Sequence, residues 1–244
     1  MRSFSNGILF LFLFCLSPST VTSQSDKKAS SRISGFVDFN FYYDTRDFSV
    51  LTYNILANLP KRFQYFSLTN YQSTNSSFDL NSFYAEHNLR WALHKNKPVD
   101  LTLQYVMRGG EDNDDFRLGI RWRANASKKL SSFFKKLNAS YSINPMFIQF
   151  RRNTAIKYMS IIEHVYRINI APKKLDRRIY IGGFVDQNFV YDGNGGLSFK
   201  WVTEHQLGLR IIDELYAILE YRINDFYAKD NYGFGYGLEY KIIF

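Results

Sequence analysis

Cysteine is nearly absent from this chain of 244 residues, in which Cys15 is the only one. Cys15 ends a short apolar run, where a lipoprotein signal would place its acylated cysteine. The preceding Phe12, Leu13 and Phe14 are not the small residues that such a signal prefers. We therefore expect Cys15 to be removed with a cleaved signal peptide. The mature chain then has no thiol, which excludes disulfides and cysteine chemistry.

The amino terminus has the parts of a secretory signal in the usual order. Arg2 supplies a positive charge, residues 8–14 form a short apolar core, and residues 21–23 offer small side chains before Gln24. The apolar core is too short to anchor the chain in a membrane. We expect residues 1–23 to be the signal peptide and the chain to be exported.

Long apolar runs are missing from the remainder of the chain. Aromatic residues nevertheless make up 18% of it, and the mean hydropathy is −0.29. A helical membrane protein needs continuous apolar segments of about 20 residues. A transmembrane barrel instead hides its apolar residues by alternation along strands. The composition therefore favours strands over membrane helices.

The chain is basic, with a formal net charge of +9. In a soluble protein this excess would suggest nucleic acid as a partner. Here the arginines and lysines are spread through the expected strands and turns and form no single basic block. Nucleic acid is therefore not an expected partner.

The last strand is the most informative segment. In residues 232–244 the seven side chains at even positions are all apolar and fall on one face, and glycine, Glu239 and Lys241 fall on the other. An edge strand of a soluble sandwich would be aggregation-prone with such a face. The segment resembles the closing strand of bacterial outer-membrane β-barrels. This resemblance implies an assembly signal at Tyr236, Leu238, Tyr240, Ile242 and Phe244.

Eleven further segments alternate in the same way, at lengths suited to tilted transmembrane strands. They cover residues 33–43, 51–59, 63–71, 83–93, 99–108, 116–123, 137–144, 162–170, 178–189, 201–211 and 215–224. We predict an all-β fold, a transmembrane antiparallel β-barrel of about 12 strands over residues 32–244. Residues 24–31 would be a short periplasmic segment, and an even strand count leaves both termini on the periplasmic side.

The connections fit this arrangement. Pro60, Pro98, Pro145 and Pro172 are expected between strands, where a missing N–H removes no ladder bond. Residues 125–136 form an unusually long periplasmic connection with four lysines. This stretch is either a short basic amphipathic helix on the inner leaflet, with Ser127 as its cap, or a solvated turn.

The expected inward face is rich in charge. The lumen-lining candidates are Asp38, Asn40, Glu86, Arg90, Arg108, Arg117, Arg121, Arg123, Glu163, Arg167, Arg178, Asp186, Glu204, Arg210, Glu220, Arg222, Glu239 and Lys241. Such a lumen must be wet or ion-paired. We expect no inward acid on the strand of Arg117 and Arg121, so that their partners come from Asp100 or Gln104. Arginine rings favour anions and phosphates in pores.

In size and lumen chemistry the mature chain resembles the small twelve-strand channels of bacterial outer membranes, of the nucleoside-specific and acidic-oligosaccharide types. The resemblance implies passive diffusion of small, anionic or polar solutes through an arginine-rich lumen. One alternative is a structural barrel with a closed, ion-paired lumen. A weaker one is a lipid-modifying hydrolase that uses His87, His164 or His205 on the lipid-facing wall.

We do not expect catalysis, a cofactor or a metal. The partners that follow from these expectations are outer-membrane lipid, the barrel-assembly machinery, periplasmic chaperones and small polar or anionic solutes. The expected location is the bacterial outer membrane.

Overall fold

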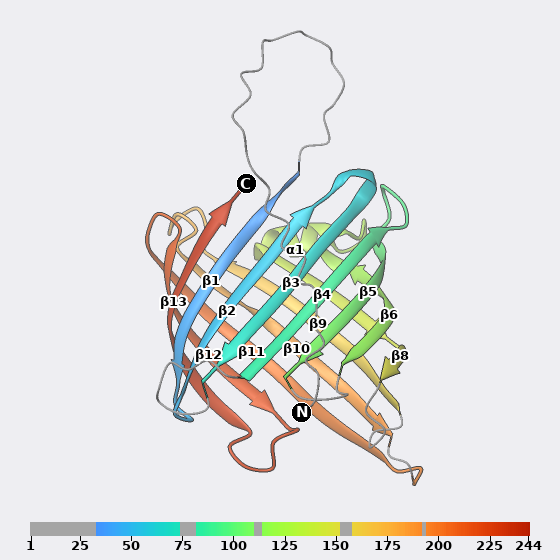
Figure 1. Ribbon diagram of the computed structural model, residues 1–244. Coiled ribbons are helices and arrows are strands. Elements are labelled where there is room, and N and C mark those ends of the chain that lie inside the picture. Colours follow the sequence, from blue (N-terminus) through green and yellow to red (C-terminus); the bar gives the residue numbers. More distant parts are fainter. Residues whose placement is uncertain (1–32, 74–81, 110–113, 152–157, 192–193) are drawn as a thin grey trace, which may run out of the picture. The chain divides into compact units, whose positions relative to one another are not determined.

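The computed structural model describes residues 33–73, 82–109, 114–151, 158–191 and 194–244. The expected signal peptide and the segment 24–31 lie outside the described residues. Thirteen strands form one antiparallel sheet (Figure 1). They are β1 Ser34–Asp44, β2 Phe48–Asn58, β3 Phe63–Gln72, β4 Ser82–Ala92, β5 Val99–Arg108, β6 Asp115–Arg123, β7 Ala139–Met146, β8 Ile148–Arg151, β9 Tyr158–Ile170, β10 Ile179–Tyr191, β11 Leu197–Ile212, β12 Leu215–Asn224 and β13 Tyr232–Ile243.

The sheet closes on itself. β5 pairs with both β4 and β6, and β1 pairs with β13 from Phe36 opposite Ile243 to Asp44 opposite Gly235. The closure continues at the carboxyl terminus, where Gly35 and Phe244 exchange two backbone hydrogen bonds of 2.8 and 3.0 Å. In a closed barrel the backbone groups of every strand edge are paired, and lipid could not have satisfied them otherwise. This closure confirms the predicted transmembrane barrel.

Two of the strands occupy one position in the wall. β7 and β8 both pair with β6, but the pairing changes by one residue between Trp122 opposite Ile143 and Leu118 opposite Ile148. Phe147 lies between the two strands as the extra residue of a bulge. Thirteen strands therefore make twelve wall positions, as the sequence predicts.

Pro145 corrects one expectation, because it lies inside β7 and not between strands. It is paired with Ile162 of β9, while the pairing of β7 with β6 is confined to Ser142 and Ile143. Its missing N–H therefore falls where the ladder is already interrupted. Gly119 of β6 faces this point, and a Cβ there would collide with the carbonyl oxygen of Pro145.

The outer surface of the barrel is a continuous apolar band. Large apolar side chains with 38–50% exposure project from strands all around the wall, among them Phe41, Leu101, Leu103, Ile120, Leu207, Leu219 and Leu238. Aromatic side chains gather toward both ends of the strands, with pairs such as Phe63–Trp91 at one end and Tyr158–Tyr191 at the other. Within the described residues, no helix is long and apolar enough to cross a membrane.

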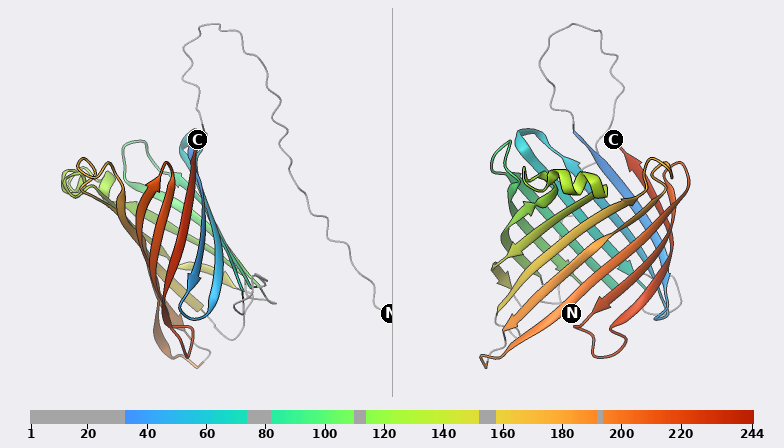
Figure 2. Two further views of the ribbon diagram at one scale, coloured as in Figure 1. Left: turned by 90° about the vertical axis from the view of Figure 1, so that its left-hand side faces the viewer. Right: turned by 180° about the vertical axis from the view of Figure 1, so that it is seen from behind.

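We call the end of the barrel with Gly35 and Phe244 the terminal rim, and the opposite end the distal rim (Figures 1 and 2). The long connection on the terminal rim contains the 3-10 turn Ala124–Ala126 and the helix α1 Ser131–Leu137. The alternative of a plain turn is therefore wrong. A further 3-10 turn, Pro60–Arg62, joins β2 to β3.

Two details of this connection differ from the expectation. Leu137 and Asn138 belong to α1 and its left-handed cap, with φ 52° and ψ 41° at Asn138, so β7 starts at Ala139 and not at residue 137. Ser127 does not cap the helix with its side chain, because Leu130 is the N-cap residue. The backbone carbonyl of Ser127 instead accepts the N–H groups of Leu130 and Ser131.

Candidate functional site

The candidate site is the interior of the barrel. Strand pairing aligns every second residue of the described strands on the inner face. The pairs Asp38 opposite Lys241, Glu86 opposite Val106, Glu163 opposite Asp186 and Glu204 opposite Arg222 trace this face around the wall. Arg178 is different, because it lies in the exposed turn before β10. Arg210 lies at the same rim and pairs with the exposed Asp176 at 2.6 Å.

Five arginines on one side of the interior share two aspartates. Asp115 forms ion pairs with Arg108, Arg117 and Arg151 at 2.9, 3.0 and 3.1 Å. Asp100 forms ion pairs with Arg121 and Arg123 at 2.5 and 3.1 Å. We call these five arginines and two aspartates, carried by β5, β6 and β8, the basic wall. Cations exceed anions there, although every arginine has an acidic partner.

The basic wall corrects one expectation and confirms another. Asp115 is the first residue of β6, so an inward acid does exist on the strand of Arg117. Asp115 lies two residues before Arg117, so the alternation places both side chains inward. In the sequence, however, Asp115 directly follows an acidic loop and looks like part of that loop. The expected partners are also present, since Arg121 Nε donates to Asp100 at 2.7 Å and Arg117 Nη1 donates to Gln104 at 2.7 Å.

Acidic side chains dominate another part of the interior. Glu204 and Glu220 share Arg222 at 2.6 and 3.0 Å. Glu239 and Asp38 share Lys241 at 2.7 and 3.9 Å. We call these four acids and two cations, carried by β1, β11, β12 and β13, the acidic wall. Anions exceed cations there.

The two walls face each other. Five wall positions separate β6 from β13 along either path around the barrel, counting β7 and β8 as one. Figure 1 shows β6 and β8 on the opposite side of the barrel from β13 and β1. The charge of the interior is therefore separated across the lumen, because the excess of each sign lies on its own side.

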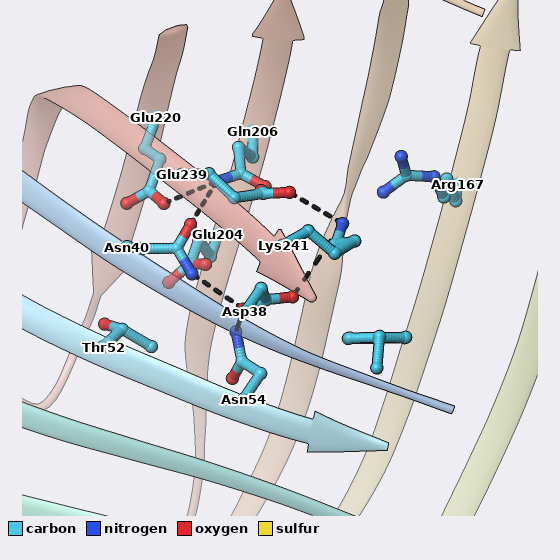
Figure 3. Close-up of a pocket in the computed structure, with 11 residues that line it drawn as sticks. Asp38, Asn40, Thr52, Asn54, Arg167, Glu204, Gln206, Glu220, Glu239 and Lys241 are labelled. Carbon is cyan, nitrogen blue, oxygen red and sulfur yellow. Dashed lines mark hydrogen bonds and ion pairs between the residues drawn. The ribbon is translucent and has the colours of Figure 1, made fainter. Parts of the chain in front are cut away.

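A cavity of about 340 Å³ lies against the acidic wall (Figure 3). Asp38 accepts the side-chain amides of Asn40 and Asn54 at 2.9 and 2.7 Å. Gln206 donates to Asn40 and Glu220 at 3.4 and 3.2 Å. Asn54, Gln206 and the four acids of this wall are among the groups that line the cavity, and Phe36 adds an apolar side chain to this mainly polar set.

Arg167 reaches the same cavity from β9. Its guanidinium carbon lies 3.6 Å from the ring centroid of Tyr180, whose hydroxyl is within hydrogen-bond distance of acceptor oxygens of both Glu239 and Gln206. Tyr180 crosses β11 at Gly208, where a Cβ would collide with the tyrosine ring. Tyr180 is not among the site residues selected above. The alternation along its strand places it inward, but no local pattern indicates its hydrogen-bond partners on β11 and β13.

Charged side chains on strands that are not neighbours interact electrostatically between the walls. Asp186 of β10 interacts with Glu163 of β9, and also with Glu86 of β4 and Arg117 of β6. Arg90 of β4 interacts with Glu163 and lies 5.4 Å from the ring of Phe66. Since β4 and β10 are not neighbours in the wall, the interaction of Asp186 with Glu86 acts across the lumen.

The three histidines considered for catalysis lie on the outer face, and each contacts a tyrosine. His87, His164 and His205 are 2.6–2.7 Å from the hydroxyls of Tyr65, Tyr141 and Tyr166 through their Nδ1 atoms. They lie on β4, β9 and β11 and are not brought together as one site. Among the described residues, no group of three or more potential ligands is placed to hold a metal ion.

The barrel is similar to solved porins. The structures described as "KdgM porin" and "KdgM porin in complex with disordered oligogalacturonate" each give a TM-score of 0.51 at 12% identity, covering 84% of this chain and 98% of the other. At this identity the similarity shows the fold alone. No family model matches the sequence, and no curated protein matches it.

Proposed function

We propose that this chain forms a channel in the bacterial outer membrane through which small polar or anionic solutes diffuse. Its closed barrel and apolar outer band suit a membrane. The secretory signal expected at residues 1–23 and the aromatic carboxyl-terminal strand support export to the outer membrane. The porin of similar fold that was solved with oligogalacturonate supports the choice of a polar, anionic solute.

The basic wall is the observation on which the solute class rests. Five arginines share two aspartates on one side of the lumen, so the local field is positive there. Arg108 and Arg123 are the most accessible of the five, with side-chain exposures of 28% and 31%. Guanidinium groups bind carboxylate and phosphate in bidentate fashion, so a passing anion would meet them first.

The lumen would be narrow. Asp186 interacts electrostatically with Glu86 and Arg117 across the interior, and a cavity of about 340 Å³ suits a small solute. The channel would therefore select solutes by their size and by their charge.

A closed structural barrel is the second candidate, and a specific observation favours it. Asp115, Glu220, Glu239 and Arg117 are only 1–4% exposed, and their charges are compensated by partners in the wall. An ion-paired interior of this kind would make the barrel rigid without any need for a passage.

Single-channel recording separates the two candidates. Protein refolded in detergent is added to a planar bilayer under a salt gradient, and its conductance and reversal potential are measured. Discrete conductance steps with a preference for anions support the channel. Absence of conductance from protein that is folded by circular dichroism would establish the closed barrel instead.

A further inference from the structure

A cluster of lysines lies on the terminal rim, outside the lumen. Six exposed lysines come from two connections, Lys128, Lys129, Lys135 and Lys136 around α1 and Lys173 and Lys174 between β9 and β10. We call these six residues the rim lysines. The only acid in these two connections is Asp176, which is paired with Arg210. The rim lysines therefore lack acidic neighbours within their own connections.

The two connections are held side by side. Ala139 at the start of β7 pairs with Ile168 of β9, and the N–H of Asn169 donates to the carbonyl of Asn138 at 3.0 Å. The connections 124–138 and 171–178 therefore leave the wall next to each other. Their lysines form one patch, although they are about 40 residues apart in the sequence.

Helix α1 presents an apolar stripe beside this patch. Leu130, Phe133, Phe134 and Leu137 are spaced to lie on one side of the helix. The ring of Phe134 stacks on Tyr141 with centroids 6.2 Å apart and planes at 16°. Tyr141 belongs to the outer face of β7, where it contacts His164. The helix therefore rests against the outside of the barrel wall, across the terminal rim (Figure 2).

Part of the apolar stripe remains exposed within the part of the chain that the structure describes. Phe133 and Leu137 are 55% and 46% exposed. They continue the apolar outer band of the wall toward the rim, at the level where a bilayer has its headgroups. A helix with exposed aromatic and aliphatic side chains next to lysines is typical of segments that lie in a membrane interface.

We propose that α1 and the rim lysines bind the headgroups of anionic glycerophospholipids in the periplasmic leaflet, with Phe133 and Leu137 inserted among the acyl chains. Charge complementarity and the exposed apolar stripe support this binding. Only the identity of the leaflet rests on the proposed function and location of the barrel. Lysines near an anionic surface each contribute roughly a fivefold change in affinity, so several together select anionic lipid.

Fluorescence quenching tests the proposal. The variant Phe133→Trp is refolded into phosphatidylcholine vesicles that contain either brominated phosphatidylglycerol or brominated phosphatidylcholine at equal mole fraction. The signal of the new tryptophan is taken as the difference from the unsubstituted protein. We expect several-fold stronger quenching by the brominated phosphatidylglycerol, and we expect high salt to reduce this excess.

Matched lysine variants locate the effect. Lys129→Gln, Lys135→Gln and Lys136→Gln together, in the Phe133→Trp background, should abolish the excess quenching by anionic lipid. The control combines Lys61→Gln, Lys95→Gln and Lys97→Gln, which removes three exposed lysines from other connections of the same rim. This control should retain the excess.

Two results would overturn the proposal. Equal quenching by both brominated lipids would show that α1 touches the membrane without selecting a headgroup. Absence of quenching by either lipid would show that the helix faces water, where a periplasmic protein or polymer could cover it. Folding is checked by circular dichroism in each sample. Because conductance plays no part in this readout, failure of the channel proposal would leave the result unaffected.

Discussion

Arg151 lies directly opposite Asp115 where β8 pairs with β6, and its Nε atom is 3.1 Å from the carboxylate. The pair depends on the bulge at Phe147. Even-numbered residues of β7, such as Asn144, face inward, whereas odd-numbered residues of β8, such as Arg151, do so. Without the extra residue, Arg151 would point into lipid and Asp115 would lose one of its three cations.

Replacing Asp115 by asparagine should destabilise the barrel strongly. Arg108, Arg117 and Arg151 would lose their shared anion in a site where Asp115 is 1% exposed. We expect a loss of about 3 kcal/mol in the free energy of unfolding, measured by urea titration from detergent micelles. The control is Asp176→Asn, whose side chain is 84% exposed in its pair with Arg210 and which should change stability by less than about 1 kcal/mol. Similar losses for both variants would contradict a role of Asp115 as the centre of the basic wall.

The double variant Arg108→Gln, Arg123→Gln tests the field of the lumen. Both arginines are partly accessible, and their acids keep other partners, because Asp115 retains Arg117 and Arg151 while Asp100 retains Arg121. We expect the reversal potential to move toward cation selectivity with little change in stability. The control is Arg210→Gln at the terminal rim, which should leave selectivity nearly unchanged. An unaltered reversal potential in the double variant would exclude these arginines as the source of anion preference.

Leu103→Arg tests the outer face. Leu103 is 38% exposed near the middle of β5, so arginine there would place a charge in lipid. We expect a loss of about 2–4 kcal/mol in unfolding titrations if the residue lies near the midplane. Leu175→Arg is the matched control, since Leu175 is also 38% exposed but lies in the turn between β9 and β10. A loss of similar size for Leu175→Arg would contradict the position assigned to the apolar band.

Deleting Phe244 tests the carboxyl-terminal assembly signal. Phe244 extends the pairing of β13 with β1 through its hydrogen bonds to Gly35, and its side chain is 49% exposed on the outer face. We expect the deletion to lower the amount of folded protein in outer-membrane fractions while export to the periplasm continues. Phe226→Ala, which removes an aromatic of 43% exposure from a distal loop, is the control. Normal assembly of the deletion variant would show that the terminal aromatic is not required.

The outward and inward faces of the strands could be predicted from the sequence. A transmembrane strand has lipid on one face and the barrel interior on the other, so its residues alternate in polarity. Apolar residues such as Leu238 and Ile242 must face lipid, and polar residues such as Glu239 must face away from it. The barrel, its twelve wall positions and the inner face of most strands follow from this one constraint, but β8 with its inward Arg151 was not recognised. Pro145 and Leu137 were placed wrongly because a strand boundary or a bulge changes the period only locally.

The sequence by itself determined the two faces of the regular strands, since the two-residue period is local. Only the tertiary structure decided which inward charges meet. The three arginines around Asp115 come from β5, β6 and β8, and the carboxylate of Asp186 interacts electrostatically with Glu86 across the lumen. Such contacts depend on strand register, on the bulge at Phe147 and on closure of the barrel, which bring together residues that no local pattern relates.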